Sequence, residues 1–89
     1  MARKDEWKKV LDWEVKRWSA IPAEQLVSEL RDTRVYEVEL DSRMYQVEVE
    51  LLENTERYIH AMVSVDDGSL PASLLPLTHT FIREKAGSH

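Results

Sequence analysis

The chain has 89 residues, of which 43% are hydrophobic and 33% charged, and this length allows one compact domain. It contains no cysteine, which excludes disulfides, thiol nucleophiles and cysteine-ligated zinc, and its two glycines cannot form a glycine-rich phosphate loop. Because no long apolar run or signal peptide is visible, we predict a soluble, cytoplasmic protein, or a recombinant one if it was engineered. We expect a single domain over residues 1–86, followed by a tag-linker remnant at 87–89.

The net charge of −5 is unevenly distributed along the chain. Residues 1–19 carry six basic and four acidic side chains, a balance of +2, so the remaining residues carry −7. The larger, anionic part of the molecule repels polyanions, and we therefore expect neither nucleic acid nor membrane as a partner. Any contact made by the basic residues has to be local.

Two helices are predicted at the N-terminus. The first covers residues 3–19, and its apolar stripe at 3.6-residue spacing consists of Trp7, Val10, Leu11, Val15 and Trp18. Glu14 lies at the edge of this stripe. Pro22 interrupts the pattern and begins a second helix over about residues 22–31, which directs Leu26, Val27 and Leu30 inward.

From Arg34 the apolar residues recur at every second position, which is typical of half-buried strands. A two-residue connection through Asp41 and Ser42 pairs Leu40 with Arg43, so that the apolar faces of the first two strands coincide. A third strand is predicted over residues 57–66.

The remaining segments complete the predicted fold. We expect a turn at 66–68, a short helical turn at 71–75 and an edge strand over 77–83. The predicted fold class is α+β, with two N-terminal helices packed on one face of a three- to four-stranded antiparallel meander. The other face of the sheet stays solvated.

The solvated face of the sheet collects Glu37, Glu39, Glu48 and Glu50. The same pairing predicts His60 opposite Glu50 and Met62 opposite Glu48. A carboxylate beside an imidazole can act as an acid/base pair or as half of a metal site, but solvated strands also need such residues for solubility. No concavity or third ligand is visible, so we assign no catalytic residue, metal or cofactor.

Trp13 departs from the pattern of its helix. Its direction lies about 150° from the apolar stripe, which predicts an exposed side chain. An exposed tryptophan near long charged side chains has the composition of an interface hot spot. The predicted partner-binding residues are Trp13, Lys9, Lys16, Arg17 and Glu6. The alternative is that Trp13 lies flat over the sheet rim or the C-terminal segment, with cation–π contacts to Lys9 or Lys16.

A secondary binding surface is predicted on the solvated sheet face. Apolar area outside the core comes from Met44, Tyr58 and Met62, which favours recognition over solubility alone. The members of this surface are Met44, Tyr58, His60, Met62, Glu48 and Glu50.

Two segments carry a resemblance to known domains. Residues 36–51 (YEVELDSRMYQVEVEL) and 65–73 (VDDGSLPAS) resemble small uncharacterised bacterial α+β domains without an assigned activity. This resemblance contains no catalytic motif and transfers no functional residue. The extra tryptophan in the polar run DWEVKRW departs from such a domain and suggests an engineered variant made to bind another protein.

Three function hypotheses follow. The first is a non-enzymatic protein-binding module, a monomer, whose helix face around Trp13 contacts a locally acidic partner; an engineered version would be a binder or inhibitor. The second is a small enzyme or metal-binding protein that uses Glu48, Glu50 and His60. The third is a structural homodimer formed through an exposed edge strand.

Overall fold

The computed structural model describes residues 2–66 and 77–85, with side chains from residue 5 onward. It confirms the predicted α+β fold. The elements in chain order are α1 (Ala2–Ser19), α2 (Ala23–Glu29), β1 (Arg34–Leu40), β2 (Arg43–Asn54), β3 (Tyr58–Asp66) and β4 (Leu77–Glu84). The turn predicted at 66–68, the helical turn at 71–75 and the tag remnant at 87–89 lie wholly or partly outside the described residues.

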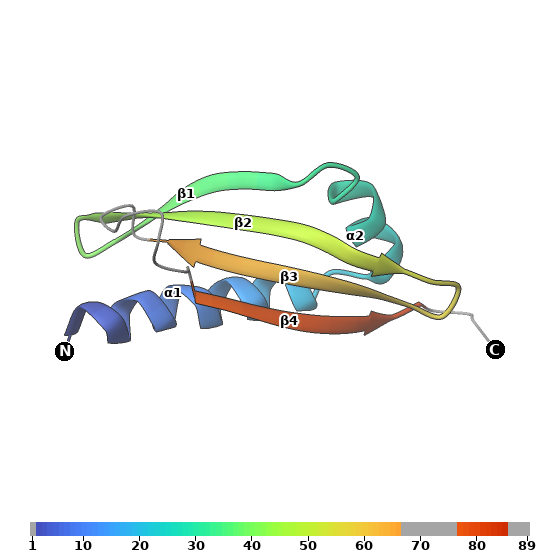
Figure 1. Ribbon diagram of the computed structural model, residues 1–89, viewed down its shortest axis with the longest axis horizontal. Helices are drawn as coiled ribbons and strands as arrows, with labels where there is room; N and C mark the ends of the chain where they lie inside the picture. Colours follow the sequence, from blue (N-terminus) through green and yellow to red (C-terminus); the bar gives the residue numbers. More distant parts are fainter. Residues whose placement is uncertain (1, 67–76, 86–89) are drawn as a thin grey trace.

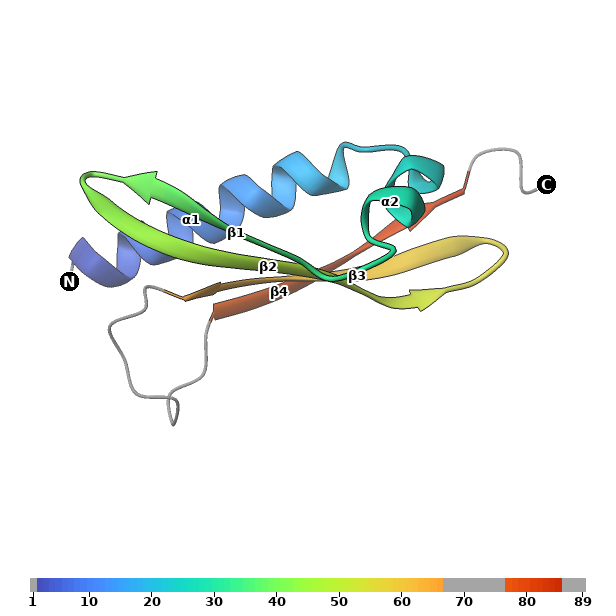
Figure 2. The same ribbon diagram turned by 90° about the horizontal axis from the view of Figure 1, so that it is seen from above.

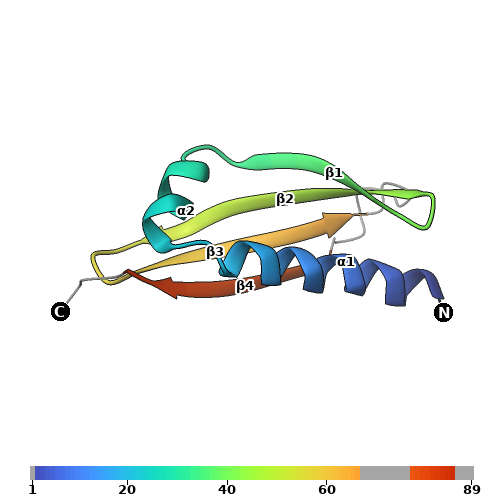
Figure 3. The same ribbon diagram turned by 180° about the vertical axis from the view of Figure 1, so that it is seen from behind.

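The molecule has two layers. The strands form one antiparallel meander in the order β1-β2-β3-β4, and the predicted strand at 77–83 is confirmed as its edge strand β4. Both helices lie on the same side of this sheet (Figure 2). The long helix α1 runs along β3 and β4, whereas α2 sits near the far ends of β2 and β3 (Figures 1 and 3). Neither described helix is long and apolar enough to cross a membrane.

The helices end where the local sequence requires it. The amide of Ile21 donates to the carbonyl of Trp18, which closes α1, and Pro22 has an extended ψ of 148° as the N-cap of α2. Pro22 therefore precedes the second helix and is not its first helical residue. The helix is also shorter than the predicted 22–31, because Leu30 leaves the helical region and caps its C-terminus.

The β1–β2 hairpin has the predicted register. Leu40 pairs with Arg43, and the inward-facing Val38 and Tyr36 pair with Tyr45 and Val47. Asp41 and Ser42 form the two-residue turn with φ values of 52° and 67°. Two consecutive positive φ angles match the turn type whose twist suits a right-handed hairpin.

The predicted β2–β3 register is wrong by two residues up to Leu51 and by three residues beyond the irregularity at Leu52. Met62 lies opposite Glu50 and not Glu48, and His60 lies opposite Glu53 and not Glu50. A two-residue shift keeps every side chain on its own face, so the hydrophobic pattern alone does not distinguish the two registers. The strand β2 runs on to Asn54, and the pairing shifts at Leu52, between Leu51 and Glu53, as in a β-bulge.

The core lies between the helices and the inner face of the sheet. It contains Trp7, Val10, Leu11, Trp18, Ala23, Leu26, Leu30, Tyr45, Val47, Val49, Ile59, Ala61, Val63 and Val65. The inward-facing residues of the edge strands are less buried than those of β2 and β3: Tyr36, Val38 and Leu40 of β1 are half-buried, as are Leu77 and Phe81 of β4. Trp7 donates its indole N–H to the carbonyl of Val65, which fixes the N-terminal half of α1 on the end of β3.

We predict that Ser42→Gly stabilises the protein by about 0.5 kcal/mol. Glycine adopts a positive φ without the steric cost that a Cβ imposes, although it also loosens the unfolded chain. The measurement is the free energy of unfolding from urea denaturation. Ser64→Gly, within β3, is the matched control and should cost about 0.5–1 kcal/mol. Equal destabilisation by both variants would contradict the left-handed turn.

Candidate functional site

Trp13 is exposed on the side of α1 that faces solvent. Its exposed fraction is 51%, whereas Trp7 and Trp18 on the same helix are 8% and 3% exposed. The predicted exposure of Trp13 is therefore confirmed. A large aromatic side chain that remains half in water contributes little to the core and is accessible to a partner.

The cationic residues around Trp13 fall into two kinds. Lys9 and Lys16 are exposed, as predicted. Arg17 is also exposed, yet its guanidinium lies 3.4 Å from the Glu14 carboxylate and packs over the rings of Trp18 and Tyr36 at 5.9 and 5.7 Å. The arginine therefore has a fixed position beside Trp13. Among the described side chains, the cation–π contacts engage Trp18 and Tyr36, and the alternative contacts between Trp13 and Lys9 or Lys16 do not form.

Glu6, the fifth predicted binding residue, is half-buried and directed toward β2. The hydroxyl of Tyr45 donates to its carboxylate at 3.2 Å, and the Nε of Arg43 lies 4.0 Å from the same oxygen. Glu6 therefore connects the first turns of α1 to the sheet. On the helical wheel Trp13 lies next to Glu6 and Arg17, whose side chains reach β2 and β1, whereas Trp13 itself is exposed to solvent.

A buried polar network sets the rotation of α1 about its axis. The Glu14 side chain is buried and accepts a hydrogen bond from the Tyr36 hydroxyl, and that hydroxyl accepts the indole N–H of Trp18 at 2.8 Å. Burial, together with the hydrogen bond to the Glu14 carboxylate, raises the pKa of Tyr36 to about 12. Because Glu14 and Trp18 are held inward, Trp13 on the opposite side is held outward.

Sequence reasoning missed this network. Glu14 lies one turn before Trp18 at the edge of the apolar stripe, and this position is the only sequence feature that indicates a buried carboxylate. Its partner Tyr36 lies on another element, and only the tertiary structure brings the two together. A buried carboxylate needs such a donor to avoid a large desolvation cost.

The predicted secondary surface lies on the outer face of the sheet, but its members do not converge. His60 lies between Glu53 and Ile82 on the neighbouring strands, so the predicted pair with Glu50 is absent. Tyr58 donates its hydroxyl to the Glu53 carboxylate at 3.2 Å, and that negative charge raises the pKa of Tyr58. Within residues 2–66 and 77–85, no group of three acidic or histidine side chains could hold a metal ion.

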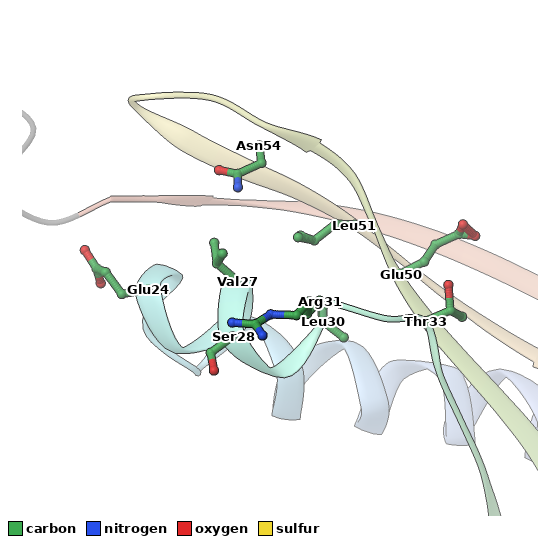
Figure 4. Close-up of a pocket in the computed structure, with 9 residues that line it drawn as sticks. All are labelled: Glu24, Val27, Ser28, Leu30, Arg31, Thr33, Glu50, Leu51 and Asn54. Carbon is green, nitrogen blue, oxygen red and sulfur yellow. The ribbon is translucent and has the colours of Figure 1, made fainter.

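A shallow cavity of about 490 Å³ lies between α2 and the end of β2 (Figure 4). Val27 and Leu51 point toward one another at its centre, while Glu24 and Glu50 lie at its two ends, far from each other. Its lining residues are Glu24, Val27, Ser28, Leu30, Arg31, Thr33, Glu50, Leu51 and Asn54. The separated carboxylates form no acid/base pair here. No sequence pattern predicts this cavity, because α2 and β2 meet only in the fold.

Comparisons of the chain with family models, with curated proteins and with solved structures found no match. The resemblance to small bacterial α+β domains therefore stays a prediction.

We predict that Tyr36→Phe lowers the free energy of unfolding by about 1–3 kcal/mol at neutral pH, because Glu14 loses its hydroxyl donor. The folded protein holds Tyr36 neutral up to a pKa of about 12, whereas an unfolded tyrosine ionises near its ordinary value of 10.0. The stabilisation from Tyr36 is therefore complete below pH 10 and is lost as the pH rises toward 12.

Urea denaturation of wild-type and Tyr36→Phe protein at several alkaline pH values measures this effect. The difference in stability between them should shrink by about 1 kcal/mol over that range, less than the full shift implies, since the side chain is only half-buried. A difference that stays constant above pH 10 would show that Tyr36 is not held neutral by the fold.

Proposed function

We propose that this chain is a non-enzymatic protein-binding module whose contact surface is the outward face of α1. The observation that carries the proposal is the exposure of Trp13 between cationic residues, on a helix whose other tryptophans are buried. The members of this helix surface are Trp13, Lys9, Lys16 and Arg17. Its cationic rim favours a partner that is locally acidic.

The fixed position of Arg17 supports this proposal. A side chain that is already ordered loses less conformational entropy when a partner binds. Arg17 is ordered by Glu14 and by the two aromatic rings under its guanidinium, and part of it still faces solvent. Lys9 and Lys16 are long and exposed, so we expect them to steer association more than they hold the complex together.

The enzymatic alternative has less support. It depended on a carboxylate–imidazole pair between Glu50 and His60, and the register separates these two residues.

The placement of Trp13 is also what the redesign of a surface for binding would produce. Covering a partner's own site, and so inhibiting it, is a natural purpose for such a module.

We predict opposite effects for two tryptophan substitutions on α1. Trp18→Ala removes a buried aromatic side chain and the hydrogen bond to Tyr36, and it should cost about 3–5 kcal/mol. Trp13→Ala should change the free energy of unfolding by no more than about 0.5 kcal/mol. Chemical denaturation of both variants measures this. A Trp13→Ala variant as unstable as Trp18→Ala would place Trp13 in the core and remove the basis of the proposal.

Binding is tested by selecting an unbiased library of displayed peptides on the wild-type protein. We expect the enriched peptides to be acidic, and to lose about 2 kcal/mol or more of binding free energy on Trp13→Ala. Leu52→Ala is the matched control, because Leu52 is similarly exposed at 47% but lies on the sheet. Enriched peptides that bind Trp13→Ala with the same affinity as the wild-type protein would contradict the proposal.

We predict a monomer in sedimentation equilibrium at micromolar concentration. Self-association through β4 would bring the charged residues Arg83, Glu84 and Lys85 at its end against a second copy. Association through β1 would bring together strands that both carry Glu37 and Glu39. A tight dimer would favour the homodimer hypothesis over the binding module.

A further inference from the structure

The strand β1 has an open edge. It lies at the margin of the sheet and contains neither proline nor lysine, the residues that commonly block such edges. Leu40 and Arg43 flank a two-residue turn, and the two residues of such a pair bond each other through both backbone N–H groups and both carbonyls. By the alternation of an antiparallel ladder, the backbone N–H and C=O groups of Val35, Glu37 and Glu39 therefore point away from β2.

The inner side of this edge still carries uncovered apolar surface. Tyr36, Val38 and Leu40 are half-buried, whereas their partners Tyr45 and Val47 on β2 are completely buried. At the opposite edge α1 runs along β4, and Arg83 of β4 donates to the carbonyl of Ile21. The inner face of β4 is no better buried, because Leu77 and Phe81 are half-buried and His79 is exposed. The two edges differ instead in their outward residues, which include Glu37 and Glu39 on β1 but Thr80 and Ile82 on β4.

A cavity of about 220 Å³ lies on the inner side of β1, between that strand and the two helices. The residues around it include Arg17, Trp18, Ile21, Gln25, Arg34 and Tyr36. An inward-facing side chain on a strand added beside Tyr36 would point toward this cavity, because side chains of neighbouring strands share a face.

The outer side of the edge is acidic. Glu37 and Glu39 face outward on β1, and the outward positions of the other described strands add Glu48, Glu50, Glu53, Asp66 and Glu84. No lysine or arginine occupies an outward position in the four described strands. A strand added here would meet negative charge on its outer side and apolar surface on its inner side.

We propose that β1 binds an extended segment of another protein as an additional strand, and that apolar and basic residues alternate along this segment. Its apolar side chains would cover Tyr36, Val38 and Leu40, and its lysine or arginine side chains would lie beside Glu37 and Glu39. Strand addition of this kind takes its affinity from main-chain hydrogen bonds and its specificity from alternate side chains. The proposal goes beyond the helix surface and does not depend on Trp13.

A second copy of the chain is a poorer occupant. Pairing two β1 strands along their whole length about a two-fold axis sets Glu37 directly opposite Glu37 of the other copy. Like charges facing each other across two strands are destabilising. The charge of the edge therefore selects a basic strand.

The test uses a synthetic peptide of the length of β1 in which lysine and valine alternate, with blocked ends and a fluorescent label. Anisotropy measures its binding to the full chain, and hydrogen exchange followed by NMR locates it. We expect the amides of Val35, Glu37 and Glu39 to gain protection when the peptide binds. The control peptide, with glutamate in place of lysine, should not bind.

Two substitutions at one position separate charge from backbone pairing. Glu37→Gln removes the charge and should weaken binding about two- to fivefold. Glu37→Pro also removes the outward N–H while leaving the ladder to β2 intact, and it should weaken binding a further tenfold or so. Denaturation midpoints show whether each variant is folded. Val35→Pro removes another outward N–H without changing a charge, and it replaces Glu37→Pro should that variant not fold.

Four results would overturn the proposal. Equal binding to Glu37→Gln and Glu37→Pro, or to wild type and a folded Val35→Pro, would mean that the edge backbone is not used. Equal binding of the glutamate peptide would remove the charge argument. Protection of amides in β3 and β4 would place the peptide on the acidic outer face of the sheet and not on the β1 edge. A tight dimer formed without peptide would make a second copy of the chain the occupant of this edge.

Discussion

The width of a helix limits how much of the sheet α1 can cover. A helix about 10 Å across covers about two strands that are spaced about 4.8 Å apart, so α1 alone cannot cover a four-stranded sheet. It lies on β3 and β4, and the short α2 covers part of what remains. The inner faces of both edge strands, β1 and β4, stay only half-buried. The hydrogen bonds that join Tyr36 to Glu14 and Trp18 hold β1 to a helix that does not lie over it.

The same arrangement separates the charges of the molecule. The outward side of α1 presents Lys9, Lys16 and Arg17, while the outward side of the sheet presents glutamates without an intervening lysine or arginine on the described strands. A helix face that mixes lysine and arginine with Asp5 and Asp12, and a sheet face without lysine or arginine, favour different partners. The net charge of −5 conceals this division, because it sums the two faces.

The sequence predicted those features that depend on local periodicity. The period of 3.6 placed Trp7 and Trp18 inside and Trp13 outside, and the period of two assigned each strand residue to its face. The β2–β3 register was wrong because a two-residue shift preserves the faces, and nothing local marked the irregularity at Leu52. The pairing of Glu14 with Tyr36 and the cavity beside α2 depend on elements that meet only in the folded chain.

The position of α1 also affects the order in which the chain can fold. The meander joins strands that are neighbours in sequence, which are contacts that form quickly. The helix α1, by contrast, is covered by β4, the last strand, and by the end of β3, where Trp7 meets Val65. During synthesis α1 is therefore made well before β3 and β4, the strands that it mainly covers. Trp18 can meet Tyr36 of β1 early, but the apolar surface around Trp7 stays uncovered until those strands are made, and exposed apolar surface of this kind favours aggregation.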